Sequence, residues 1–280
     1  MDDFFEIDFL DVEAKSSGDA IPCRYSVGGV MFIHVTDGGF QSTGDTLVEH
    51  INKYYDSPSF IDNVVVTHPD GDHAGGIRSL FEEFEIGSLW MLRPWKYAEE
   101  LIDRFSRFTS VDGLRKRLKE LYPNLVALEE LADENGVEIC EPFQGAGIGH
   151  FTVMAPTKAS YLDLVVESDK TPEATKQAEA SLVMKALAAI GNGMMTSVRA
   201  LWGQESFPED DTSAENNMSV VQYATLCGKT ILLTGDAGRA TWPAALYNYY
   251  LSLLPSSRRV FSMPASEVIN CLWTRDCRRT

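Results

Sequence analysis

The stretch HPDGDH at residues 68–73 is the part of the chain whose residue types most clearly permit chemistry. Two of the five histidines of the chain lie there, together with two aspartates. Histidine nitrogens and carboxylate oxygens bind Zn²⁺ and other divalent transition ions. A tight turn can direct such side chains toward two adjacent ions about 3.5 to 4 Å apart, as in hydrolases that use a metal-activated hydroxide. The candidate ligands in this turn are His68, Asp70, Asp72 and His73.

A plain turn is the alternative interpretation of residues 68–73. Proline, aspartate and glycine are favoured in turns, which accounts for the four residues between the histidines. This interpretation gives no reason for a histidine at each end of the stretch. We therefore predict a metal site, on condition that the rest of the chain supplies further ligands.

The segments on either side of the turn predict a strand before it and a helix after it. The β-branched run at 61–67 is typical of a buried central strand. Apolar residues at helical spacing predict an amphipathic helix over 75–84. Further upstream, the patterns predict strands at 4–12, 20–26 and 30–35 and a helix at 44–55.

Downstream of the turn, strand patterns alternate with helix patterns. A charged helical stretch covers 95–136 and is predicted to form surface helices. Residues 191–216 are polar and irregular, which predicts a long loop. Residues 218–236 predict a β-hairpin that turns at 227–229 and ends at Asp236. The remaining predicted elements are a strand at 88–94, a strand pair at 137–143 and 150–157, and helices at 158–168, 171–190 and 237–254.

The composition limits the classes of function. The formal net charge of −17 disfavours a broad surface for nucleic acid or an anionic membrane, because both partners are polyanions. No apolar run approaches the roughly 20 residues that span a bilayer, and the acidic start lacks the basic region of a secretory signal. The five cysteines are scattered, with no C-x-x-C pair, which is typical of reduced thiols. We therefore expect a cytoplasmic protein without a membrane partner.

Several motifs together resemble one superfamily. The string H-x-D-x-D-H-x-G-G after a hydrophobic strand resembles the metallo-β-lactamase superfamily, whose common motif is H-x-H-x-D-H. Its aspartate in the third position resembles the branch that contains the hydrolase domain of ComEC-type competence proteins and their stand-alone relatives. Further agreement comes from IDFLDV and GDAI within 7–21, HVTDGGF at 34–40 and the hairpin with LLTGDAG at 216–238. The resemblance implies an α/β fold, the layered αββα sandwich of this superfamily.

The same resemblance implies two divalent ions, Zn or Mn, and assigns ligands to them. His68 and Asp70 would hold one ion, and Asp72 and His73 would hold the other. Asp236, at the end of the predicted hairpin, would bridge the two ions. Asp72 would also orient the hydroxide or take its proton, because a carboxylate beside a metal-bound water is a natural base.

The chain departs from the superfamily pattern after Asp236, where a further histidine is expected in an H-H-G-S stretch. None follows, since the last histidine of the chain is His150. The abrupt change of composition over 256–280 favours a tail that is out of frame or truncated, which would leave the sandwich incomplete at its C-terminal edge. A degenerate relative, or replacement of the ligand by another residue, are the alternatives. His150 is the obvious substitute, but its place at the start of a predicted strand favours a structural role. Asp37, in D-G-G, is predicted to support the ligands from behind.

The predicted organisation is one metallo-β-lactamase-like hydrolase domain. It covers 1–255, with the helical insertion at 95–136, the loop at 191–216 and an atypical tail at 256–280. The resemblance implies hydrolysis of a phosphodiester, in a nucleic acid or a nucleotide. Hydrolysis of a small ester, thioester or lactone by the same ions is the second interpretation, because one fold hosts many reactions. A catalytically impaired, metal-deficient remnant is the third, and the missing final histidine favours it.

Overall fold

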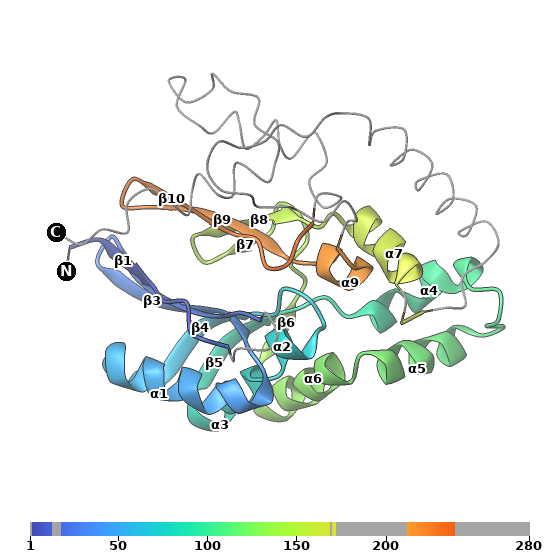
Figure 1. Ribbon diagram of the computed structural model, residues 1–280, viewed down its shortest axis with the longest axis horizontal. Helices are drawn as coiled ribbons and strands as arrows, with labels where there is room; N and C mark the ends of the chain where they lie inside the picture. Colours follow the sequence, from blue (N-terminus) through green and yellow to red (C-terminus); the bar gives the residue numbers. More distant parts are fainter. Residues whose placement is uncertain (1, 13–17, 169, 172–211, 239–280) are drawn as a thin grey trace, which may run out of the picture.

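Two β-sheets face each other, with helices packed outside them (Figure 1). This arrangement is seen in a computed structural model that describes residues 2–12, 18–168, 170–171 and 212–238. The architecture is mixed α/β, and it confirms the predicted αββα sandwich.

The first sheet has six strands in the order β1-β2-β3-β4-β5-β6. The strands are β1 (Phe4–Ile7), β2 (Ala20–Val27), β3 (Val30–Gly38), β4 (Phe60–Val65), β5 (Glu85–Trp90) and β6 (Glu138–Cys140). The first three strands pair antiparallel, whereas β3 to β6 pair parallel. Parallel strands need crossover connections, so the carboxyl ends of β3, β4 and β5 meet at one edge of the sheet. The candidate site lies at this edge.

The second sheet has four antiparallel strands in the order β10-β9-β8-β7. They are β7 (Gly147–Ile148), β8 (Phe151–Ala155), β9 (Val221–Leu226) and β10 (Lys229–Leu233). The predicted hairpin at 218–236 is confirmed as β9 and β10. The predicted strand pair at 137–143 and 150–157 is wrong, because β6 joins β5 in the first sheet while β8 joins β9 in the second. The chain crosses between the sheets in the glycine-rich segment at 144–149, and periodicity alone does not reveal such a crossing.

Helices cover the outer face of the first sheet, with α1, α3 and α6 below it in Figure 1. The longer helices are α1 (Gly44–Tyr54), α3 (Ile77–Glu83), α5 (Val111–Leu121), α6 (Pro123–Asn135) and α7 (Lys158–Glu167). The shorter ones are α2 (Gly71–Ala74), α4 (Ala98–Leu101) and α9 (Ala214–Asn217), with 3₁₀ turns η1 (Gln41–Thr43), η2 (Pro94–Tyr97) and η3 (Ile102–Arg104). Among the described residues, no helix combines the length and the apolar character that crossing a bilayer requires.

The predicted helices agree with the structure in type, with two corrections. The helix predicted over 75–84 begins only at Ile77, because a separate turn of helix, α2, precedes it. The loop predicted over 191–216 contains the start of α9, whose Ser213 side chain accepts a hydrogen bond from the Asn216 backbone N–H. Three further predictions lie largely or wholly outside the described residues: the loop up to residue 211, the tail at 256–280, and the helices predicted at 171–190 and 237–254, of which only 171, 237 and 238 are described.

Apolar side chains fill both spaces beside the first sheet. Successive side chains along β2 and β4 point to opposite faces of the sheet, so one set faces the helices and the other faces the second sheet. Leu47, Leu80 and Leu118 are fully buried in the layer beneath the helices. Val65 of β4 and Phe151 of β8 pack together in the layer between the sheets. Burial of apolar surface stabilises a fold by about 25 cal/mol per Å². Both layers therefore stabilise the edge of the sheet at which the site lies.

A polar contact also joins the two sheets inside the second layer. His34 of β3 pairs through Nε2 with Oε1 of Gln222 of β9 at 2.9 Å, and Gln222 Nε2 donates to Thr36 Oγ1 at 3.0 Å. The His34 ring stacks on Phe151 with centroids 4.5 Å apart. Burial lowers the pKa of His34 to about 4, although its hydrogen bond to Gln222 opposes this change. His34 is therefore neutral near pH 7 and donates its Nε2 proton to Gln222.

Candidate metal centre

The turn after β4 brings two histidine rings together. The strand ends at Val65, and His68 and His73 follow it, the second on the one-turn helix α2. Both side chains are buried, and their ring centroids lie 4.0 Å apart. Buried imidazoles at this distance need partners that satisfy their nitrogens, and these partners define the site.

Two pairs of glycines set the position of α2. The amide of Gly76 donates to the carbonyl of Gly39 at 3.0 Å, which joins α2 to the turn after β3. A Cβ atom on Gly76 would lie 2.0 Å from the carbonyl oxygen of Gly38, so no other residue fits. The φ angle of Gly76 is −80°, which any residue adopts, so space and not backbone conformation requires glycine here. The sequence motifs D-G-G and H-x-G-G are therefore two sides of one contact.

Asp37 orients the second histidine. Its carboxylate is fully buried, and its Oδ2 accepts hydrogen bonds from His73 Nδ1 at 2.8 Å and from Thr67 Oγ1 at 2.6 Å. Its Oδ1 accepts from the Thr67 backbone N–H at 2.8 Å. Asp37 has a φ of 58°, in the left-handed region that aspartate tolerates better than most residues. Asp37 thus supports a candidate ligand from behind, as the sequence predicted.

Hydrogen bonds to Nδ1 leave the Nε2 atoms of both histidines free. His68 Nδ1 lies 2.9 Å from Thr67 Oγ1 and 3.3 Å from Ser219 Oγ. Because the Thr67 hydroxyl donates to Asp37, it accepts from His68, so His68 carries its proton on Nδ1. His68 Nε2 and His73 Nε2 are buried and have no hydrogen-bond partner among the described residues. Two such orphaned nitrogens in one place are costly unless a cation occupies the space between them.

Asp236 brings a carboxylate from the second sheet to these nitrogens. It follows β10, and its Oδ2 lies 3.6 Å from His73 Nε2. One ligand atom from each of His68, His73 and Asp236 lies within 4.8 Å of the others. Two imidazole nitrogens and a carboxylate oxygen form a ligand set that suits a catalytic divalent ion, with a position left open for water. The residues therefore fit a bound metal ion.

The charges at the centre are arranged for a cation. Burial lowers the pKa of His73. The charge of Asp37, the close approach of Asp236 and the hydrogen bond to Asp37 outweigh this effect and raise the pKa to about 11. Burial and the neighbouring charge of His73 lower the pKa of His68. Burial raises the pKa of Asp236, but His73 more than offsets it, and the net direction is down. The pocket thus concentrates negative charge around one imidazole, where a metal ion can replace the proton.

Asp70 lies beside His68, and Asp72 lies next to His73 on α2. Asp70 is the residue before α2, and its side chain makes no capping hydrogen bond to the helix. Its Oδ2 lies 3.8 Å from His68 Nε2, and its Oδ1 accepts a hydrogen bond from Lys170 Nζ at 2.7 Å. Asp72 is half-buried on α2 and belongs to neither group of converging ligand atoms among the described residues. The structure therefore gathers His68, His73 and Asp236 and places Asp70 beside them, and the roles of Asp70 and Asp72 as ligands stay predictions.

The comparison with protein families agrees with this geometry. Residues 35–170 match the family model described as the metallo-beta-lactamase superfamily. This part of the chain is a metallo-β-lactamase superfamily domain. The match identifies the superfamily and not the ComEC-type branch within it. No curated protein shows significant similarity to the chain. The match to this superfamily over residues 35–170 suggests a metal-dependent hydrolase.

The candidate metal centre includes residues that motif reading did not single out. Asp19 lies with Asp37 and His73 in a second group of converging ligand atoms. Burial, followed by the charge of Asp37, raises the pKa of Asp19 to about 6. The G-D-A-I turn was the signal for Asp19, since its glycine packs against α2, where a Cβ on Gly18 would lie 2.4 Å from the Asp72 carbonyl. Lys170 had no such signal.

The other histidines of the chain have partners elsewhere. His150 lies edge-on to Tyr25 and to Phe32, with ring centroids 5.8 Å and 5.2 Å away. His50 on α1 pairs with Asp8 at 3.0 Å. His150 belongs to neither group of converging ligand atoms, and its ring contacts agree with the predicted structural role.

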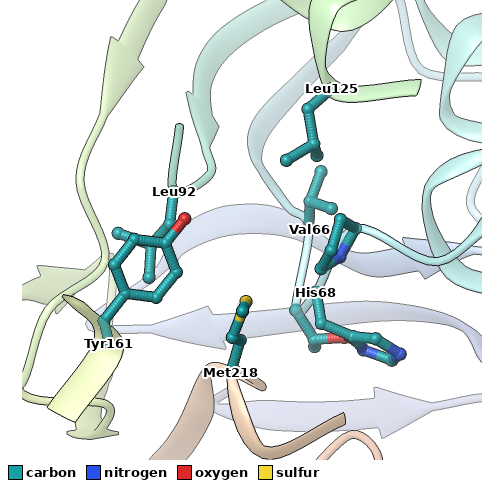
Figure 2. A pocket seen from close by; sticks show the side chains of 8 residues that line it. Val66, His68, Leu92, Leu125, Tyr161 and Met218 are labelled. Atoms are coloured by element: carbon teal, nitrogen blue, oxygen red, sulfur yellow. Dashed lines mark hydrogen bonds between the residues drawn. The ribbon is translucent and has the colours of Figure 1, made fainter. Parts of the chain in front are cut away.

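A small apolar hollow lies beside His68 in the metallo-β-lactamase domain. Figure 2 shows the imidazole at one side of it, directed away from Leu92 and Tyr161. The lining residues are Val66, Thr67, His68, Pro69, Leu92, Leu125, Tyr161 and Met218. Because most of these groups are apolar, they keep water from this side of the ring, which is a physical cause of the lowered pKa of His68.

Proposed function

We propose that the protein is a metal-dependent hydrolase of phosphodiester bonds and that His68, His73 and Asp236 hold its ion. The observation that carries the metal site is the pair of buried Nε2 atoms that have no hydrogen-bond partner among the described residues and converge with the Asp236 carboxylate. The aspartate in the third position of H-x-D-x-D-H supports the phosphodiester class, through its resemblance to the ComEC-type branch. The ion is either Zn or Mn, because both accept mixed nitrogen and oxygen ligands.

The residues of the chain have distinct tasks in this proposal. When bound, a divalent ion supplies Lewis acidity and lowers the pKa of a water ligand. Asp37 keeps the proton of His73 on Nδ1, so that Nε2 is directed into the site. Thr67 and Ser219 do the same for His68. These contacts fix both rings before substrate arrives, so little reorganisation is needed during the reaction.

Access and proton transfer involve the outer side of the centre. The Asp236 side chain is 28% exposed, whereas both imidazoles are buried, so substrate reaches the ion from the side of Asp236. We assign proton transfer to Asp72, as the superfamily resemblance implies, since it lies next to His73 on α2 and is partly accessible. A carboxylate in this position is suited to accept a proton from water.

The test is an assay of the metal-loaded full chain with two substrates in parallel. We expect cleavage of bis(p-nitrophenyl) phosphate that is lost with a chelator and restored by Zn²⁺ or Mn²⁺. A lactone serves as the competing substrate class. Lactone cleavage without phosphodiester cleavage would overturn the substrate class, and a chain that binds no metal would overturn the whole proposal.

Substitutions of single histidines distinguish the proposed metal ligands from histidines outside the site. His73→Ala is expected to lower kcat/KM by at least about 100-fold, because it removes a ligand from an already small set. His150→Ala is the matched control, since His150 is exposed and its ring contacts Tyr25 and Phe32 away from the converging ligand atoms. It should change kcat/KM by less than about twofold. Equal losses in both variants would contradict the assignment of the site.

A further inference from the structure

Lys170 places a positive charge directly beside the metal centre. Its Nζ donates to Asp70 Oδ1 at 2.7 Å, while the other oxygen of Asp70 lies 3.8 Å from His68 Nε2. A hydrogen bond between an ammonium and a carboxylate is among the stronger hydrogen bonds in proteins. One oxygen of Asp70 is therefore already occupied by a cation of the chain itself.

Buried contacts hold the segment that carries Lys170. Its backbone N–H donates to Ser168 Oγ at 3.1 Å, and the Ser168 hydroxyl in turn donates to the buried Glu215. Thr171 follows, and its hydroxyl donates to the Val165 carbonyl at 2.6 Å. Hydrogen bonds on both sides of Lys170 thus direct it to Asp70, even though its side chain is 41% exposed.

The number of histidine side chains near the centre limits how many metal ions it can hold. All five histidines of the chain are described, and among the described residues His68 and His73 are the histidines in the two groups of converging ligand atoms, with His73 in both. Together with Asp236 they supply three ligand atoms within 4.8 Å of one another. Three protein ligands and one open position are the usual set for one catalytic zinc ion. A second ion would depend on oxygen ligands, of which Asp70 is the nearest to His68.

We infer that this centre holds one divalent ion and that the Lys170 ammonium takes the place of a second. Lys170 does so by neutralising Asp70 and keeping that carboxylate out of metal coordination. A second dication near Asp70 would have to displace this ammonium, or it would be repelled by it at short range. The inference rests on the proposed function, because it concerns the same site, and it replaces the two ions implied by the resemblance.

The test is the metal stoichiometry of the full chain, which does not depend on activity. Metal-free protein is titrated with Zn²⁺ by calorimetry, and the bound metal is counted by elemental analysis after desalting. We expect one equivalent in the unmodified chain and in Lys170→Arg, which keeps the positive charge. Lys170→Met, of similar length but uncharged, should bind a second equivalent. Lys158→Met is the matched control, since Lys158 pairs with Glu100 at 2.7 Å away from the centre, and it should bind one.

The double variant Lys170→Met/Asp70→Asn tests whether a second bound ion depends on Asp70 and not on an unrelated site. It should return to one equivalent, because the second ion needs the carboxylate that Lys170 releases. Two equivalents in the unmodified chain, or one in a folded Lys170→Met variant, would overturn the role of Lys170 and leave the proposed function intact. No bound metal in any of the variants would overturn the proposed function itself.

Discussion

Asp37 Oδ2 accepts a hydrogen bond from His73 Nδ1 at 2.8 Å, and this contact directs the opposite nitrogen of the ring into the metal centre. The same oxygen accepts from Thr67, which holds His68. One carboxylate therefore orients both histidines, although it is not among the three ligand atoms gathered with Asp236. Support of this kind contributes to metal affinity through orientation and through ligand basicity.

Asp37→Asn should weaken metal binding by about 10- to 100-fold while the fold is retained. The amide group can donate where the carboxylate accepted, so His73 is driven to carry its proton on Nε2, which then cannot bind metal. Asparagine tolerates the φ of 58°, so the backbone is not strained. Competition with a chromophoric chelator measures the affinity. Asp45→Asn, at an exposed position of α1, is the control and should leave the affinity unchanged.

Gly76→Ala should lower the free energy of unfolding by about 1 to 3 kcal/mol, because its Cβ would lie 2.0 Å from the Gly38 carbonyl oxygen. Gly71→Ala in the neighbouring helix is the matched control. Its Cβ would meet only the Asn124 amide, at 3.4 Å, which is close to ordinary contact. Urea unfolding monitored by circular dichroism gives both values. Equal unfolding midpoints for the two variants would contradict the close contact.

Metal binding should raise the melting temperature of the chain. Free metal at 100 times its dissociation constant adds about 2.7 kcal/mol to the stability of the folded state. For a domain of this size that corresponds to a rise of about 5 to 10 °C. Differential scanning fluorimetry with and without Zn²⁺ measures the shift. The shift should be absent in His73→Ala, and its persistence there would show that the metal binds elsewhere.

The buried His34 should make the protein less stable in mild acid. Its pKa is lowered from 6.5 to about 4 by burial, so between these values the unfolded chain binds a proton that the folded chain does not. The stability that depends on neutral His34 is therefore fully present above pH 6.5. As the pH decreases from 6.5 toward 4, the free energy of unfolding falls by up to about 1.4 kcal/mol per pH unit. Denaturant midpoints at pH 7 and pH 5 measure this slope. His34→Gln removes the titrating group, and an undiminished slope in that variant would contradict the assignment.

The local part of the site was predictable because one short turn contains it. His68 and His73 lie five positions apart, and the β-branched run before them identified the strand that ends at the site. Asp37 and Asp236 were also predicted, because Asp37 lies at the end of a strand before a glycine pair and Asp236 follows the hairpin. Ligand chemistry and strand patterns both act over a few residues, so a single sequence reveals them.

The non-local part was not predictable from these patterns. Lys170 follows a helix at no characteristic spacing, and only the folded chain brings it to Asp70. The pairing of β6 with β5 was missed for the same reason, since alternation predicts a strand but not its neighbour. Leu118 lies in a charged helical stretch predicted to lie at the surface, yet it is fully buried. Composition describes the outer side of such a helix and not the face that it packs against the core.

The contact of Gln222 with His34 and Thr36 has a consequence for the order in which the protein matures. His68 and His73 follow a strand of the first sheet, whereas Asp236 follows the hairpin that Gln222 joins to that sheet. The complete ligand set exists only after these distant segments have docked, which carries a high entropic cost of loop closure. A nascent chain that has folded only its first half would hold metal weakly. If the proposed site holds metal, tight binding would therefore report that both sheets have docked.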